Sequence, residues 1–77
     1  MRVFVNAAPV EIAKGADVRT AVQAHDPDLL RKLTDGAAYV TDARGIELSA
    51  DALLSEGSIL RVVVSARRAA EGRDAHA

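Results

Sequence analysis

Hydrophobic and polar residues alternate along the first part of the chain, which is the pattern of strands with one buried face. At the N-terminus, residues 1–6 and 10–13 alternate in this way, and the turn residues between them predict a β-hairpin over Met1–Ala13. Near the other end, Leu60–Val64 is the most β-prone run, with three consecutive valines. A run that is apolar on both faces is typical of an inner strand. We therefore expect Leu60–Val64 to be the central strand of a sheet.

The segment after the hairpin changes to helical spacing. Asp17 can act as an N-cap for a stripe of apolar residues. That stripe comprises Val18, Ala21, Val22, Leu29, Leu30 and Leu33. Pro27 disfavours helical geometry at Asp26, although Asp followed by Pro also begins a helix well. We therefore expect either one kinked helix or two short helices over Asp17–Thr34, ended by Gly36 in the left-handed conformation.

Shorter elements occupy the stretch before the central strand. Residues Ala37–Thr41 predict a third strand with Tyr39 on its outer side. After a turn, Ile46–Leu48 predicts a short strand. A single helical turn capped by Ser49 and carrying two leucines is expected next.

The order of these elements determines the topology. The first and last strands cannot be joined by a tight turn, but they can lie parallel as the middle pair of a mixed sheet. The sequence therefore predicts an α+β fold of the β-grasp (ubiquitin-like) type over residues 1–65, with a four- to five-stranded mixed sheet and one kinked helix packed on one face. Residues 66–77 combine charges with alanine and have no large apolar residue, so they predict a mobile tail.

Composition narrows the class of partner. A net charge of −1 and a pI near 6.0 argue against nucleic acid and anionic membranes as general partners. The absence of cysteine excludes a thiolate nucleophile and fits a reducing cytoplasm. No apolar run reaches the length that spans a membrane, and the N-terminus enters a strand directly. We expect a soluble cytoplasmic protein.

Candidate catalytic and ligand-binding residues all have simpler explanations. His25 falls near the end of a predicted helix, where it can cap the carbonyl groups. Together with Asp26 and Asp28 it offers too few and too closely adjacent ligands for a metal. The loop Asp42–Gly45 lacks the glycine-rich strand-to-helix context of a phosphate cradle and is better explained as a hairpin turn. We therefore expect no enzymatic activity, no cofactor and no metal.

One surface is a stronger candidate than these side chains. If alternate residues face the helix, namely Met1, Val3, Val5, Leu60, Val62 and Val64, the other face of the sheet is left open. On that face we expect a partner-binding patch with both aromatic residues of the chain, comprising Arg2, Phe4, Tyr39, Arg61 and Val63. The alternative is ordinary exposed apolar surface, which every protein has. The uncovered edge at Val10–Ile12 could also pair strands between copies of the chain.

Four segments carry a resemblance to a known family. They are Arg2–Asn6, Pro9–Ile12, Gly15–Val18 and Glu56–Leu60. In their turns and apolar positions these segments resemble the small bacterial sulfur carriers of the ThiS and MoaD type, which are relatives of ubiquitin. The resemblance implies the β-grasp fold and binding to proteins through the open face of the sheet. Such carriers end in Gly-Gly, whose terminal carboxylate is adenylated and converted to a thiocarboxylate.

The sequence departs from that family at its C-terminal end. It contains no Gly-Gly, its last residues are Asp74-Ala75-His76-Ala77, and Gly72 stands alone before Arg73. A bare glycine pair lets a backbone thread a narrow channel where any Cβ would clash. We therefore expect a non-enzymatic module that binds another protein, as a small subunit of a larger complex. The alternative is a sulfur carrier or protein modifier that is activated after its tail has been processed.

Overall fold

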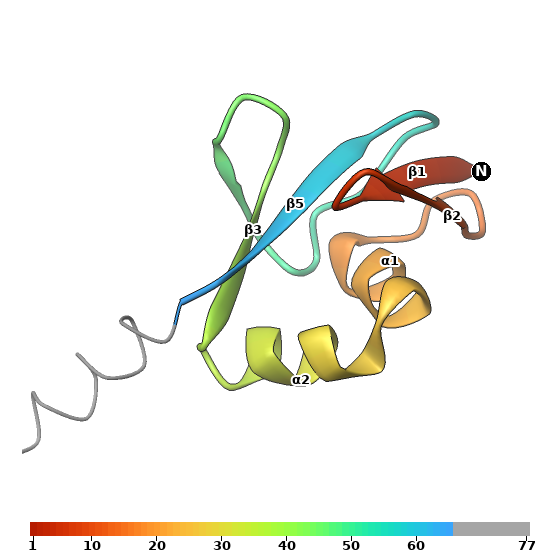
Figure 1. The fold of residues 1–77 in the computed structure, drawn as a ribbon. Helices are drawn as coiled ribbons and strands as arrows, with labels where there is room; N and C mark the ends of the chain where they lie inside the picture. The colour runs from red at the N-terminus through yellow and green to blue at the C-terminus, as the bar shows by residue number, and fades with distance from the viewer. Residues whose placement is uncertain (66–77) are drawn as a thin grey trace, which may run out of the picture.

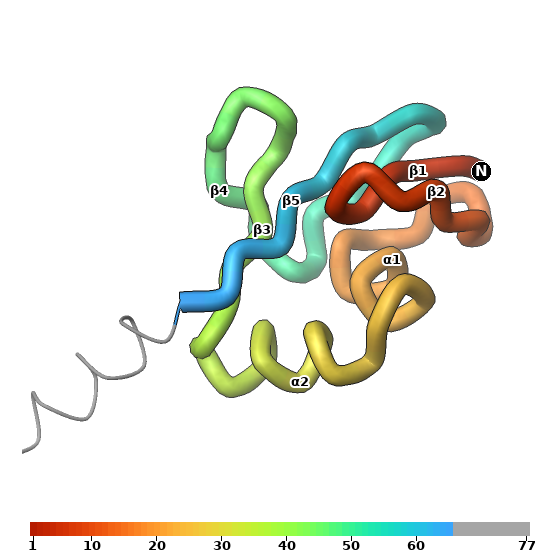
Figure 2. Tube along the Cα trace, in the orientation of Figure 1, coloured from red at the N-terminus to blue at the C-terminus, as the bar shows by residue number. Residues whose placement is uncertain are grey.

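The valine-rich run near the end of the chain lies at the centre of the sheet, as predicted. The computed structural model describes residues 1–65 and shows an α+β architecture with one open, mixed sheet in the order β2-β1-β5-β3-β4 (Figure 2). The strands are β1 (Arg2–Val5), β2 (Ala8–Glu11), β3 (Ala38–Thr41), β4 (Glu47–Leu48) and β5 (Ile59–Val64), and the helices are α1 (Val18–His25) and α2 (Pro27–Thr34). β1 runs parallel to β5, and the other strand pairs are antiparallel. The predicted parallel pair of first and last strands is therefore confirmed.

Both helices lie on the same side of the sheet, and the core fills the space between the two layers (Figure 1). Alternate residues of the strands point into it, as the period of two requires. The buried apolar residues are Val3, Val5, Val10, Ile12, Val18, Ala21, Val22, Ala38, Val40, Leu60 and Val62. Val64 was predicted to face the helix, but 48% of it is exposed. That prediction is wrong because β1 pairs only with Ile59 and Leu60, so β3 alone lies beside the end of β5.

Asp26 separates the helical segment into two helices, so the prediction of one kinked helix is wrong and the alternative of two short helices is correct. Its backbone is extended, with φ −162° and ψ 108°. Its N–H donates to the carbonyl of Val22 at 2.8 Å, and its carboxylate accepts from the N–H of Asp28 at 3.0 Å. Asp26 thus ends α1 and caps α2, with Pro27 at the first position. Neither helix within residues 1–65 is long and apolar enough to cross a membrane.

The loop between β4 and β5 contains no helical turn, contrary to prediction. The N–H of Ala52 donates to the carbonyl of Ser49 at 3.1 Å, which closes a tight turn. The carbonyls of Ala50 and Ala52 instead accept from the N–H groups of Arg19 and Val18, at 2.9 and 3.0 Å. These N–H groups have no partner within α1. The loop therefore stays non-helical, because two of its carbonyls accept hydrogen bonds from the first turn of α1.

The hairpin of β1 and β2 closes through the two residues Asn6 and Ala7, which both have positive φ, 52° and 69°. Two successive positive φ values are the signature of the type I′ turn that matches strand twist. Met1 and Ile12 exchange two hydrogen bonds, at 2.8 and 2.9 Å. Because such pairs alternate along an antiparallel ladder, Pro9 occupies a non-hydrogen-bonded position. Its missing N–H therefore falls on the outer edge of the sheet.

Candidate protein-binding face

The face of the sheet turned away from the helices carries the five residues predicted for partner binding. Phe4 and Tyr39 are half-buried there, 36% of Val63 is exposed, and Arg2 and Arg61 are exposed. Tyr39 and Val63 are direct partners across β3 and β5. Directly opposite residues of neighbouring antiparallel strands lie about 5 Å apart. The structure therefore brings these two side chains together.

Ile59 belongs to the same face and was missing from the predicted patch. It is the partner of Phe4 across the parallel pair of β1 and β5, and 47% of it is exposed. On the other side of Phe4 lies Pro9 of β2. The alternation in β5 was the signal that could have found Ile59, since it precedes the inward-facing Leu60. We define the open face as Phe4, Tyr39, Ile59, Arg61 and Val63.

A shallow groove of about 560 Å³ runs along the β1 side of the open face. It is lined by Phe4, Asn6, Ala7, Ile59, Leu60 and Arg61. Apart from the Asn6 amide and the Arg61 guanidinium, the side chains of this lining are apolar. The groove therefore offers an apolar floor with a single formal charge.

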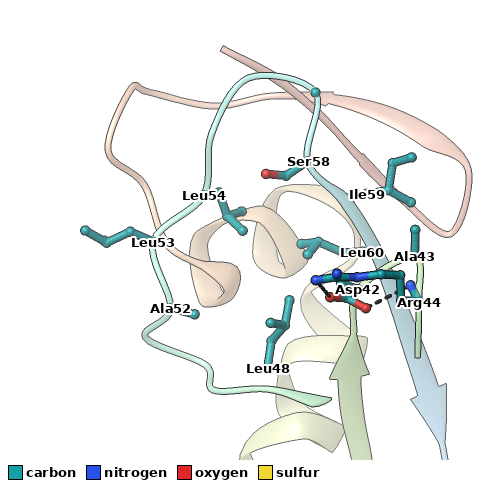
Figure 3. Close-up of a pocket in the computed structure, with 11 residues that line it drawn as sticks. Asp42, Ala43, Arg44, Leu48, Ala52, Leu53, Leu54, Ser58, Ile59 and Leu60 are labelled. Carbon is teal, nitrogen blue, oxygen red and sulfur yellow. Dashed lines mark hydrogen bonds and ion pairs between the residues drawn. The ribbon is translucent and has the colours of Figure 1, made fainter. Parts of the chain in front are cut away.

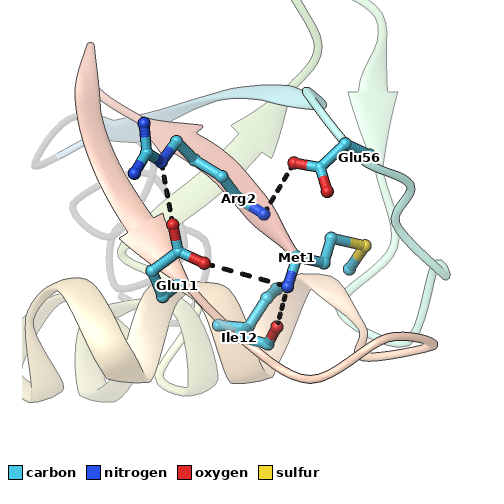
Figure 4. A network of polar contacts seen from close by, with 5 residues as sticks. All are labelled: Met1, Arg2, Glu11, Ile12 and Glu56. Carbon is cyan, nitrogen blue, oxygen red and sulfur yellow. Dashed lines mark hydrogen bonds and ion pairs between the residues drawn. The ribbon is translucent and has the colours of Figure 1, made fainter.

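The two arginines of the predicted patch differ in their electrostatic surroundings. The Nε of Arg2 donates to Oε1 of Glu11 at 2.8 Å, and the other oxygen of Glu11 lies 3.8 Å from the ammonium group of Met1 (Figure 4). The backbone N–H of Arg2 also donates to Glu56 at 2.8 Å. Arg61 has no counter-ion among residues 1–65. Arg2 is thus part of an internal network, whereas Arg61 forms no ion pair within the part of the chain that the structure describes.

A second groove, of about 360 Å³, lies between the β3–β4 turn and the loop that precedes β5 (Figure 3). It shares Ile59 and Leu60 with the first groove, and its other side chains include Leu48 and Leu54. Leu53 also lines it, although 76% of this side chain is exposed. Ile59 and Leu60 therefore line both of these adjoining grooves.

The turn at Asp42 uses its carboxylate on its own backbone. Oδ1 accepts from the N–H groups of Arg44 and Ile46, at 2.8 and 3.0 Å. The hydrogen bond from Ile46 is the main cause that lowers the pKa of Asp42, and Arg44 contributes in the same direction. The Arg44 guanidinium lies 3.5 Å from Oδ2. These bonds agree with the interpretation of this segment as a hairpin turn.

The remaining candidate residues lie apart from the open face. His25 is in the last turn of α1, and Asp26 and Asp28 are at the start of α2. Within residues 1–65, no three His, Asp or Glu side chains form a group that could hold a metal ion. The predicted tail, with Gly72, lies outside the described residues. The domain boundary after residue 65 accordingly stays a prediction.

Comparison of the chain with family models, with curated proteins and with solved structures finds no match.

Proposed function

We propose that this chain is a non-enzymatic, ubiquitin-like binding module of the β-grasp class that binds another protein through the open face of its sheet. The observation that carries the proposal is the gathering of Phe4, Tyr39, Ile59 and Val63 on the side of the sheet opposite the two described helices. Both aromatic residues of a chain with 3% aromatic content lie in this group. Aromatic side chains are enriched among the residues that carry most of the binding energy of protein interfaces.

The arrangement of strands supports the β-grasp part of the proposal. A parallel pair, β1 and β5, lies inside a mixed sheet, and the chain between β2 and β3 crosses one face as helices. This is the arrangement implied by the resemblance to sulfur carriers. Fold alone does not define function, so the binding role rests on the side chains of the open face.

The exposed area of these side chains is the source of the expected affinity. Ile59 and Val63 keep 47% and 36% of their surface in water. Covering apolar surface yields about 25 cal/mol per Å² before the costs of association. A protein that covers the open face would remove these side chains from water together with Phe4.

The absence of cysteine supports placing this module, as a small subunit of a larger complex, in the cytoplasm.

The test is affinity purification with matched variants, followed by mass spectrometry of the retained proteins. The Phe4→Ala/Val63→Asp variant removes apolar surface from the open face. Arg31→Glu on α2 is the control, since Arg31 is exposed on the opposite layer. We expect proteins retained by the unmodified chain and by the control to be lost from the double variant. The same recovery from all three chains, each with an unchanged melting temperature, would overturn the proposal.

A further inference from the structure

Arg61 occupies the middle of the open face. On β5 it lies between Ile59 and Val63, two residues from each, so all three side chains point to the same side. It also lines the groove that contains Phe4. A protein that covers Phe4 and Ile59 therefore also covers the guanidinium of Arg61.

Three carboxylates near the sheet are engaged in hydrogen bonds away from Arg61. Glu11 and Glu56 accept hydrogen bonds from Arg2, and Asp42 accepts from its own turn. Glu47 lies in the same cross-strand row as Arg61, but β3 runs between them, which places their backbones about 10 Å apart. No ion pair within the described residues joins Glu47 to Arg61. Among the described residues Arg61 therefore has no ion-pair partner, and its neighbours on the same side of β5, Ile59 and Val63, are apolar.

That charge constrains the chemistry of the partner. Removing a guanidinium from water is strongly unfavourable unless an opposite charge and hydrogen bonds replace the water. A carboxylate is the suited group, because it accepts two parallel N–H bonds from one guanidinium. Resting on the proposed function, we infer that the partner presents an Asp or Glu side chain, flanked by apolar residues, to Arg61.

The surroundings of Arg61 favour a protein carboxylate over nucleic acid. Binding to a phosphate backbone is driven by several cations that act together. Here Arg2 is already paired with Glu11, and the neighbours of Arg61 along β5 and in its groove, Ile59, Val63 and Phe4, are apolar. A single arginine on an apolar surface matches one acidic side chain within an apolar segment.

The test selects ligands from a displayed library of random dodecapeptides on the immobilised full chain. We expect the retained peptides to carry Asp or Glu next to apolar residues. A synthetic peptide of the selected sequence should bind Arg61→Gln about tenfold or more weakly than the unmodified chain, with Arg61→Lys in between because lysine lacks the planar fork. Replacing the acidic residue of the peptide by its amide should weaken binding to the unmodified chain but not to Arg61→Gln.

Two further variants separate this inference from the proposed function. Arg19→Gln removes an exposed arginine from α1, on the opposite layer, and should bind the peptide as the unmodified chain does. Phe4→Ala should weaken binding. Peptides that need Phe4 but show no acidic preference and bind Arg61→Gln equally well would overturn the inference about Arg61 and leave the binding face intact. A library that yields no peptide dependent on Phe4 would count against both.

Discussion

The side chain of Asn6 accepts a hydrogen bond from the backbone N–H of Val62, with its Oδ1 2.9 Å from the nitrogen. β1 ends at Val5, so no strand carbonyl is available to this N–H. The parallel ladder thus continues for one step through a side chain. Asn6 also begins the hairpin turn at φ 52°, a conformation that asparagine tolerates better than most residues. One residue therefore joins the hairpin to the central strand.

Replacing Asn6 tests this double role. Asn6→Ala should lower the free energy of unfolding by about 1–3 kcal/mol, because a partly buried N–H loses its acceptor and alanine is less favourable at positive φ. Asn6→Gly, which loses only the acceptor, should be less destabilising, and Asn6→Asp should lie nearest to the unmodified chain. Urea unfolding followed by circular dichroism measures the series. Equal midpoints for the alanine and aspartate variants would contradict the assigned hydrogen bond.

Ala7 offers a stabilising substitution. It holds φ 69° in the type I′ turn, where a Cβ is unfavourable. Ala7→Gly removes that strain at some cost in unfolded-chain entropy, so a net gain of about 0.5–1 kcal/mol is expected. Ala43→Gly is the matched control, since this alanine lies in a turn without positive φ and should give no gain. Thermal unfolding compares the two, and a loss of stability in Ala7→Gly would show that the turn relaxes in solution.

The carboxylates of Asp17 and Asp42 should contribute to a loss of stability in acid. Hydrogen bonds from the N–H groups of Thr20 and Ile46 lower the pKa of Asp17 and Asp42, respectively, below the ordinary 3.8. A carboxyl group whose pKa is lower in the folded state contributes stability above its unfolded-state pKa and loses it as the pH falls through the folded-state pKa. We expect urea midpoints to decline below about pH 4 and the Asp17→Asn/Asp42→Asn variant to decline less. Parallel pH curves for the two chains would refute this assignment.

Pro9 should limit pairing between copies through the edge strand β2. At its non-hydrogen-bonded position its nitrogen faces outward, where any other residue would present a donor to a neighbouring strand. Pro9→Thr restores that donor, so the variant should associate more strongly than the unmodified chain in sedimentation equilibrium. Thr20→Val, a change within α1 away from this edge, serves as the control for altered surface. Stronger association of the unmodified chain than of Pro9→Thr would mean that copies meet elsewhere.

The carrier alternative makes a prediction about mass. Because the sequence lacks Gly-Gly, we expect protein isolated from its own cell to show neither cleavage next to Gly72 nor an oxygen-to-sulfur exchange at its end. Intact-mass spectrometry reads both changes directly. A species ending at Gly72, or one heavier by the difference between sulfur and oxygen, would favour the sulfur carrier over the binding module.

Much of the sheet could be predicted because its strands keep the period of two. Val3, Val5, Leu60 and Val62 alternate with polar or outward residues, and all four are buried. The same rule identified the outward position of Val63. It did not reveal that Val64 is exposed. That exposure follows from the point at which β1 ends, which depends on the tertiary structure rather than on the residues of β5.

Contacts between distant segments account for the remaining errors. A helical turn after Ser49 was plausible locally, but Ala50 and Ala52 direct their carbonyls to α1. Similarly, nothing in the local pattern shows that Arg2 is paired with Glu11 whereas Arg61 has no ion-pair partner in the described range 1–65. Predicting such pairings requires the register of the strands, which sequence periodicity does not supply.

The capping of α1 by the loop before β5 has a consequence for folding. Val18 and Arg19 obtain their hydrogen-bond acceptors from a segment in the second half of the chain, and Leu54 donates back to Ala16. The first turn of this helix is therefore completed only after a long stretch of chain has closed, a step that slows folding through its high contact order. Loop and helix end should open together as one cooperative unit, with matching rates of amide hydrogen exchange.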